Sequence, residues 1–396
     1  MEYTYSENAH KLVSSAIRDI LKMAQRPGVI SLSAGNPAPA AFPKEAIAKI
    51  VNDIFATDPV KALQYSTTDG EASFLKYLKE YESEKHGLFF ENDSLMITGG
   101  AQQVMLLTAR ILCNPDEIIL VEEPSFVGSL NSFRSIGAKL VGVPMEDDGL
   151  NLEILEQKAK ELSPKLLYVI PNFQNPTGIT TSLEKRKAIY EIAKKYNIII
   201  IEDNPYGELR YEGEHIPAIK SFDTEGIVMY AGSFSKVISP GLRVGYAIGP
   251  ADIIKKMVVA KQADDVHTSI LSQLICHKVM TETDYEAYLD GLRALYAKKL
   301  NLCLELFEKH LAPYGVKKSP VYGGLFVWCS LPENIDMNEF CEKALTEFDV
   351  AVVPGGAFFC APENVTNSFR INFSTPSDDQ MKEGFARLEK ALKSFI

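Results

Sequence analysis

The stretch Ile198-Ile199-Ile200-Ile201, followed at once by Glu202-Asp203-Asn204-Pro205-Tyr206, is the most strand-like run in the chain. A strand that is apolar at every position is buried on both faces, which is typical of a parallel sheet covered by helices. Comparable runs that end in polar or small residues occur, with helical patterns between them, at 94–98, 117–122, 166–170 and 227–230. The sequence therefore predicts an α/β fold in which helices cover both faces of a mostly parallel sheet.

Polar and small residues follow these strands at the point where each one ends. The carboxyl ends of parallel strands meet at one edge of a sheet, and ligands bind outside that edge. We therefore expect one site to be built from Gly100, Ala101, Gln102, Phe126, Asn175, Asp203, Tyr206, Ser233, Ser235, Lys236 and Arg243.

The loop Ser233-Phe234-Ser235-Lys236 suggests the chemistry of this site. A lysine amine can form an imine with an aldehyde, and the serines together with Arg243 can hold an anion. Such a loop is equally well explained by a surface lysine, because a short motif is only a hypothesis until its context is known.

The neighbouring residues match the other parts of an aldehyde cofactor. Gly100 opens a helix whose first N–H groups can bind a phosphate, and Asp203 can pair with a cationic ring nitrogen. Asn175 and Tyr206 can hold a ring oxygen, although Asn175 could instead simply make its turn. Phe126 could cover a flat ring, with core packing as the alternative. Pyridoxal phosphate has all of these parts, and Lys236 would then move the proton of the substrate α-carbon.

Composition excludes several other classes of function. The 396 residues carry a net charge of -11 and no basic block, which argues against nucleic-acid binding. The six cysteines form no Cys-x-x-Cys pair and the histidines lack metal spacing, so we expect free thiols and no metal site. No apolar run approaches the roughly 18 residues of a membrane span, and the first residues lack a signal-peptide pattern, which indicates a cytoplasmic protein.

Taken together, these motifs resemble the fold-type I pyridoxal-phosphate aminotransferases of class I/II over nearly the whole chain. The resemblance implies an imine between Lys236 and the cofactor. It implies that Asp203 pairs with the ring nitrogen of the cofactor, that Asn175 and Tyr206 bind the ring oxygen, and that Phe126 stacks on the ring face. It implies phosphate binding by a set that comprises Gly100, Ala101, Gln102, Ser233, Ser235 and Arg243. Ala101 stands where many relatives have serine, so only its backbone can make that contact.

The resemblance also implies how substrates are bound. Arg370, in Phe369-Arg370-Ile371-Asn372-Phe373, would bind the substrate α-carboxylate bidentately, and Gly35 would line the pocket beside Asn175. Tyr65 would reach the site of a neighbouring subunit, which implies a homodimer with shared active sites. The implied domains are an N-terminal helix and substrate-covering loop at 1–45, a large cofactor-binding domain at 46–285 and a small C-terminal domain at 286–396.

The stretch from Ser14 to Pro39 resembles the 2-aminoadipate/kynurenine aminotransferase branch. In that branch an arginine like Arg18 can meet a distal carboxylate, whereas the ordinary interpretation is a solvated helix charge. The implied activity moves the amino group of 2-aminoadipate, an aromatic or a branched-chain L-α-amino acid to a 2-oxo acid such as 2-oxoglutarate, by a ping-pong mechanism. Asn36 replaces a larger apolar residue of many relatives, so the side-chain preference stays open.

Two alternatives remain at this point. A carbon–sulfur β-lyase could use the same cofactor residues, and it would release pyruvate and ammonia without 2-oxoglutarate. A ligand-sensing transcription regulator would need a DNA-binding domain, and only some 25 residues precede Arg26, too few for one.

Overall fold

The structure, a computed structural model, describes residues 3–5, 23, 26–361 and 366–396. Most of the predicted N-terminal helix and the predicted substrate contact Arg18 lie outside these residues. Among the described residues, no helix is long and apolar enough to cross a membrane.

An eight-stranded sheet forms the centre of the fold, in the order β2-β9-β8-β7-β6-β3-β4-β5. Its strands are β2 (Asp93–Thr98), β3 (Ile118–Glu123), β4 (Lys139–Glu146), β5 (Gly149–Leu150), β6 (Leu166–Val169), β7 (Ile199–Asn204), β8 (Val228–Ser233) and β9 (Gly245–Pro250). Strands β3, β6, β7 and β8 are parallel neighbours, which confirms the predicted sheet. Strand β4, which pairs in parallel with β3, and the short β5 beside it were not predicted. Strand β9 was not predicted, and it runs antiparallel to both β8 and β2, so β2 has the direction of β8.

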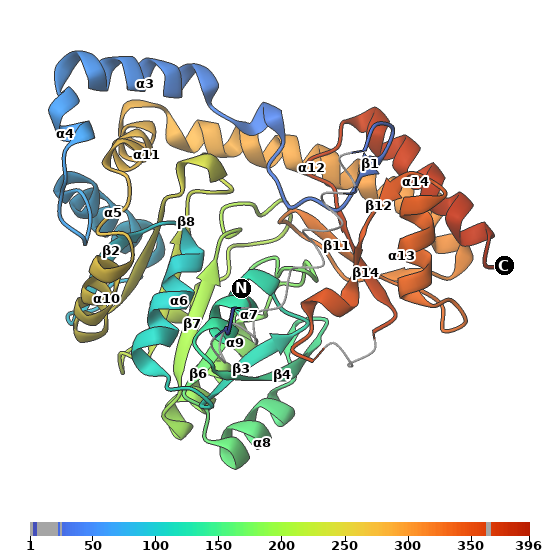
Figure 1. Cartoon of the computed structure of the whole chain (residues 1–396), viewed down its shortest axis with the longest axis horizontal. Coiled ribbons are helices and arrows are strands. Elements are labelled where there is room, and N and C mark those ends of the chain that lie inside the picture. The colour runs from blue at the N-terminus through green and yellow to red at the C-terminus, as the bar shows by residue number, and fades with distance from the viewer. Residues whose placement is uncertain (1–2, 6–22, 24–25, 362–365) are drawn as a thin grey trace.

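Helices cover both faces of this sheet (Figure 1). They are α6 (Ala101–Leu112), α7 (Val127–Ser135), α8 (Leu152–Leu162), α9 (Leu183–Tyr196) and α10 (Ala251–Asp264). The isoleucine run shows why: Ile200 packs with the helices of one face and Ile201 with those of the other, and both are fully buried. A strand in which apolar and polar residues alternate would expose one face to water, whereas β7 is buried on both faces.

A second, antiparallel sheet lies in the C-terminal part of the chain, in the order β10-β11-β14-β13. Its strands are β10 (Lys317–Lys318), β11 (Phe326–Ser330), β13 (Val353–Pro354) and β14 (Ser368–Asn372), packed with α13 (Met337–Thr346) and α14 (Asp378–Lys393). The short β1 (Ile30–Ser31) pairs with β12 (Val350–Ala351), which joins the N-terminal stretch to this part. The long helix α12 (Tyr285–His310) spans both parts of the molecule (Figure 1).

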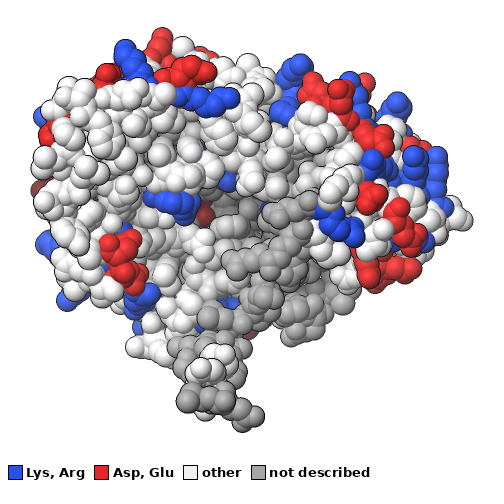
Figure 2. Space-filling model, turned by 45° about the horizontal axis from the view of Figure 1, so that its top comes forward, with Lys and Arg blue, Asp and Glu red and all other residues white. Residues whose placement is uncertain are grey.

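The remaining elements surround the large sheet or connect its strands. The helices are α3 (Lys44–Thr57), α4 (Pro59–Leu63), α5 (Ala72–His86) and α11 (Ile270–Glu282), and the 3₁₀ turns are η1 (Pro39–Ala41), η2 (Ile219–Phe222), η3 (Pro240–Leu242), η4 (Ala312–Tyr314) and η5 (Gly355–Phe358). On the face shown in Figure 2, acidic and basic side chains lie interspersed, mostly toward the upper rim and the C-terminal side. All six cysteines are free thiols, as predicted, and only Cys360 is more than slightly exposed.

Candidate active site

A cavity of about 260 Å³ lies beyond the carboxyl ends of the parallel strands. The predicted residues that line it are Gly35, Ala101, Gln102, Phe126, Asn175, Asp203, Tyr206, Ser233, Ser235, Lys236, Arg243 and Arg370. They come together because β2, β3, β6, β7 and β8 all end at the same edge of the sheet. The predicted convergence is therefore observed.

Two of the predicted residues that the structure describes do not line this cavity. Tyr65 is 81% exposed and places its ring edge against His267. Gly100 lies behind the cavity wall, where an added Cβ would be 2.6 Å from the Arg243 guanidinium, and its φ of 86° favours glycine. Arg18 is outside the described residues.

Lys236 projects its amine into the cavity, where Nζ donates a hydrogen bond to the carbonyl oxygen of Gly35 at 2.9 Å. Burial, together with the positive charges of Arg370 and Arg243, lowers the pKa of this amine to about 8. A larger fraction of this amine is therefore neutral at pH 7 than at a solvated lysine. The neutral form of an amine is the one that acts as a nucleophile or a base.

Asp203, near the end of β7, is only 3% exposed. Its Oδ2 accepts a hydrogen bond from the Tyr168 hydroxyl at 2.7 Å, and its Oδ1 is buried without a partner among the residues that the structure describes. Burial raises the pKa of this carboxyl to about 7, and the Tyr168 hydroxyl opposes that shift. Tyr168 was missed in the sequence, where its one signal was a polar hydroxyl inside an otherwise apolar strand.

An anion-binding corner lies at the start of α6. The N-terminus of α6, the hydroxyls of Ser233 and Ser235, and the Arg243 guanidinium all border this end of the cavity. Arg243 adopts a left-handed backbone with φ of 54° and donates to the Gly99 carbonyl at 3.1 Å, which turns its side chain toward the helix. Backbone N–H groups, hydroxyls and a fixed positive charge are the donors that suit a phosphate.

Arg370 forms the opposite end of the cavity from the second sheet. Its Nη1 donates to the Asn175 Oδ1 and its Nη2 to the Ser33 carbonyl, both at 2.8 Å, while Nε is buried and has no partner in the described part of the chain. The guanidinium lies 4.1 Å from the ring centre of Phe326 and 5.0 Å from that of Phe358. These contacts fix the guanidinium, although burial lowers its pKa to about 10. The two phenylalanines were not predicted from the sequence.

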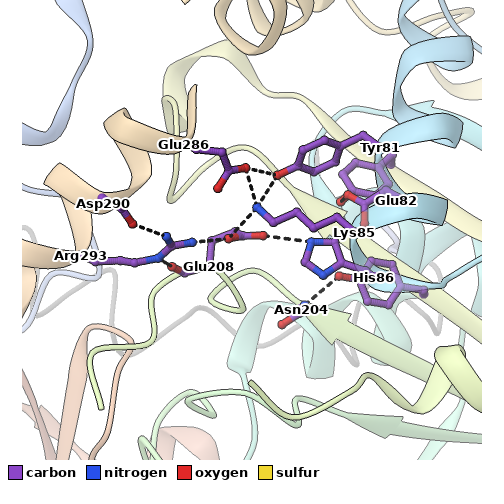
Figure 3. Close-up of polar contacts among 11 residues, drawn as sticks. Tyr81, Glu82, Lys85, His86, Asn204, Glu208, Glu286, Asp290 and Arg293 are labelled. Atoms are coloured by element: carbon purple, nitrogen blue, oxygen red, sulfur yellow. Dashed lines mark hydrogen bonds and ion pairs between the residues drawn. The ribbon is translucent and has the colours of Figure 1, made fainter. Parts of the chain in front are cut away.

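A larger cavity of about 430 Å³ lies on the other side of the lysine loop, but Lys236 does not line it. Its charged groups largely neutralise one another: Glu208 contacts Arg293 at 2.6 Å, His86 at 3.1 Å and Lys85 at 3.6 Å (Figure 3). This network joins the end of α5 to α12 through the loop after β7. We therefore place the candidate active site in the smaller cavity, where reactive groups lie beside unpaired polar atoms.

Comparison with known proteins identifies the family of this chain. The family model described as aminotransferase class I and II matches residues 27–388. Aromatic-amino-acid aminotransferase 1 of Thermococcus litoralis is 38% identical, with 99% of this chain and 94% of the relative covered. The solved kynurenine aminotransferase of Pyrococcus horikoshii has a TM-score of 0.94 and 37% identity, covering 98% of this chain and 97% of that one.

A third relative bears on the cofactor. The solved α-aminoadipate aminotransferase LysN of Thermus thermophilus, complexed with N-(5'-phosphopyridoxyl)-L-leucine, has a TM-score of 0.90 and 33% identity, covering 99% of this chain and 97% of that one. The match extends over both sheets and over every strand end that borders the cavity. This chain therefore belongs to the class I and II aminotransferases and is a pyridoxal-phosphate-dependent transaminase.

Proposed function

We propose that this enzyme transfers the amino group of a broad set of L-α-amino acids, of 2-aminoadipate, aromatic or branched-chain type, to a 2-oxo acid such as 2-oxoglutarate. The observation that carries the proposal is one cavity that holds the Lys236 amine, the buried Asp203 carboxylate and the fixed Arg370 guanidinium. The names of the relatives support the substrate classes, since they act on aromatic amino acids, kynurenine and α-aminoadipate.

The residues present fit pyridoxal phosphate. The unpartnered Asp203 Oδ1 suits a ring N–H, and the corner at α6 suits the phosphate. An added Cβ at Gly245 would lie 2.6 Å from the Ala101 nitrogen, so glycine there keeps the backbone close to the phosphate corner. We propose that Asn175 and Tyr206 bind the ring oxygen and that Phe126 covers the ring.

Bound pyridoxal phosphate supplies a reactive aldehyde and a ring that withdraws electrons from the substrate. Lys236 would take the proton from the substrate α-carbon at Nζ and pass it to the bound cofactor, which keeps the amino group; a pKa of about 8 is well suited to this role. Arg370 would bind the α-carboxylate and so set which bond faces the ring.

We propose that Gly35, Tyr65 and Arg18 complete the substrate site. The carbonyl of Gly35 already meets the Lys236 amine, and a Cβ there would be 3.1 Å from the Phe326 ring, so glycine lets that ring pack closely against the loop at the cavity. Arg18 would contact a distal carboxylate. This contact is to be tested by Arg18→Ala, which should slow single-turnover amino transfer to the enzyme-bound cofactor from 2-aminoadipate and glutamate while leaving that from leucine unchanged.

We propose a homodimer with shared active sites. Tyr65 does not reach the cavity of its own chain, and Val60, Leu63 and Tyr65 are 68%, 70% and 81% exposed. Mixing Tyr65→Ala with Lys236→Ala chains would restore roughly a quarter of wild-type activity, because one site in each mixed dimer is complete. Failure to restore any activity, with mixed dimers demonstrated, would contradict shared sites.

We also propose the division into an N-terminal segment at 1–45, a large domain at 46–285 and a small domain at 286–396. The two separate sheets, joined by α12, support this division. A cytoplasmic location is proposed on the free thiols, which are typical of a reducing compartment.

The deciding experiment is a panel of amino donors assayed with and without 2-oxoglutarate. We expect glutamate to form only when both substrates are present. Release of pyruvate and ammonia without a 2-oxo acid would instead favour a β-lyase, an activity that the relatives named above do not carry in their names.

A further inference from the structure

Tyr168 connects the buried Asp203 to α7 through a chain of hydroxyl groups. Ser129 Oγ donates to the Tyr168 hydroxyl at 2.9 Å, and that hydroxyl donates to Asp203 Oδ2 at 2.7 Å. Tyr168 and Ser129 are fully buried. A tyrosine hydroxyl has a single hydrogen, so accepting from Ser129 leaves that hydrogen for the carboxylate.

The sheet places these groups in register. Tyr168 lies opposite Ile201 in the parallel pairing of β6 and β7, and Asp203 is two residues further along β7. Side chains two residues apart point to the same face, so Tyr168 reaches Asp203 diagonally across that face. The Phe133 ring of α7 packs edge-on against the Tyr168 ring at 5.4 Å between centres, which holds the phenol in place.

We propose that Tyr168, supported by Ser129, is a positioning residue that keeps Asp203 ionised and turns its free Oδ1 toward the ring nitrogen of the cofactor. This inference rests on the proposed cofactor role of Asp203. Its physical basis is that a buried carboxylate without hydrogen bonds takes up a proton. Tyr168 supplies the one protein donor observed among the described residues at Oδ2, and it leaves Oδ1 available.

The test compares two ligands for the apoprotein: pyridoxal phosphate and its carbocyclic analogue, in which a C–H replaces the ring nitrogen. Binding would be measured at equilibrium by calorimetry for wild type and Tyr168→Phe. We expect pyridoxal phosphate to bind about ten-fold more weakly to the variant, the value of one hydrogen bond to a charged group. Binding of the analogue should change less than two-fold, because it has no nitrogen for Asp203 to meet.

Tyr190→Phe is the matched control. Tyr190 is also a buried tyrosine that bonds to an aspartate, Asp223 at 3.4 Å, but it lies in the core on the other face of the sheet. It should bind both ligands as wild type does. Ser129→Ala should weaken pyridoxal phosphate a few-fold and leave the analogue unchanged, and it decides the question if Tyr168→Phe does not fold.

Equal losses for the two ligands in Tyr168→Phe would show a merely structural role and overturn the inference, as would unchanged binding of pyridoxal phosphate. If wild type did not prefer pyridoxal phosphate over the analogue, the proposed role of Asp203 itself would fail. The two kinds of failure can be told apart. The results that overturn the role of Tyr168 are read only when wild type prefers pyridoxal phosphate over the analogue, whereas loss of that preference in wild type concerns Asp203.

Discussion

Replacing Arg370 by lysine tests the proposed carboxylate site most directly. The guanidinium makes two hydrogen bonds at 2.8 Å, to Asn175 and Ser33, and is held between two phenylalanine rings. It can therefore offer a substrate its remaining donors in a fixed orientation. A lysine ammonium keeps the charge but lacks the planar set of donors, and it leaves at least one of the two buried acceptors unpaired.

The expected loss follows from these contacts. Losing the bidentate component of a charge-assisted interaction in a buried site costs about 3 kcal/mol, which corresponds to a roughly 100-fold fall in kcat/KM for an amino acid. The assay compares L-phenylalanine with 2-phenylethylamine, which lacks the α-carboxylate, in single-turnover amino transfer to the enzyme-bound cofactor. The rate with the amine, low in wild type, should change less than three-fold in Arg370→Lys.

A matched variant separates the site from general damage. Arg293→Lys is this variant, because Arg293 also donates to a carbonyl and to a carboxylate, both of Glu208. Arg293 lines the second cavity, so its replacement should leave the rates with L-phenylalanine and with 2-phenylethylamine unchanged. If the amino acid and the amine lose activity equally in Arg370→Lys, the arginine supports the structure and does not bind the carboxylate. If neither rate falls, another group holds the carboxylate.

Three further predictions concern other parts of the molecule. Borohydride should fix pyridoxal phosphate onto Lys236, seen by peptide mapping, and an adduct at another residue would contradict the assignment. Gly100→Ala should press on Arg243, where the Cβ would lie 2.6 Å from Nη2, and weaken pyridoxal phosphate about ten-fold while leaving phosphate-free pyridoxal unchanged in calorimetry. Glu208→Gln should lower the free energy of unfolding at pH 7 by about 2 kcal/mol. Burial opposes ionisation of Glu208, but His86, Lys85 and Arg293 outweigh it and lower the pKa of this carboxyl to about 2. A lowered carboxyl pKa stabilises the fold above its unfolded value of 4.5, so the difference in melting temperature should shrink as pH falls from about 4.5 toward 2. A difference independent of pH would refute this account, and Glu286→Gln, whose side chain is 56% exposed, should change little.

Local pattern was sufficient to predict the sheet and the contents of its active edge. The Ile198–Ile201 run predicted a strand buried on both faces because helix packing removes water from each side, and parallel direction brings the strand ends together whatever lies between them. For that reason Asn175, Asp203 and Lys236 could be assigned to one site without knowing the loops. Strands β4, β5 and β9 were missed, and β9 follows the segment that carries Lys236 and Arg243 and runs antiparallel to its neighbours.

The partners that tune these groups are decided only by tertiary structure. Tyr168 meets Asp203 through the pairing register of two strands, and Phe358 meets Arg370 from a different sheet segment. Neither contact can be predicted from the sequence, because each joins residues that lie far apart in the chain and belong to no recognisable motif. The sequence by itself determined which reactive groups gather at the sheet edge; burial and long-range hydrogen bonds, which exist only in the folded chain, decided their protonation and orientation.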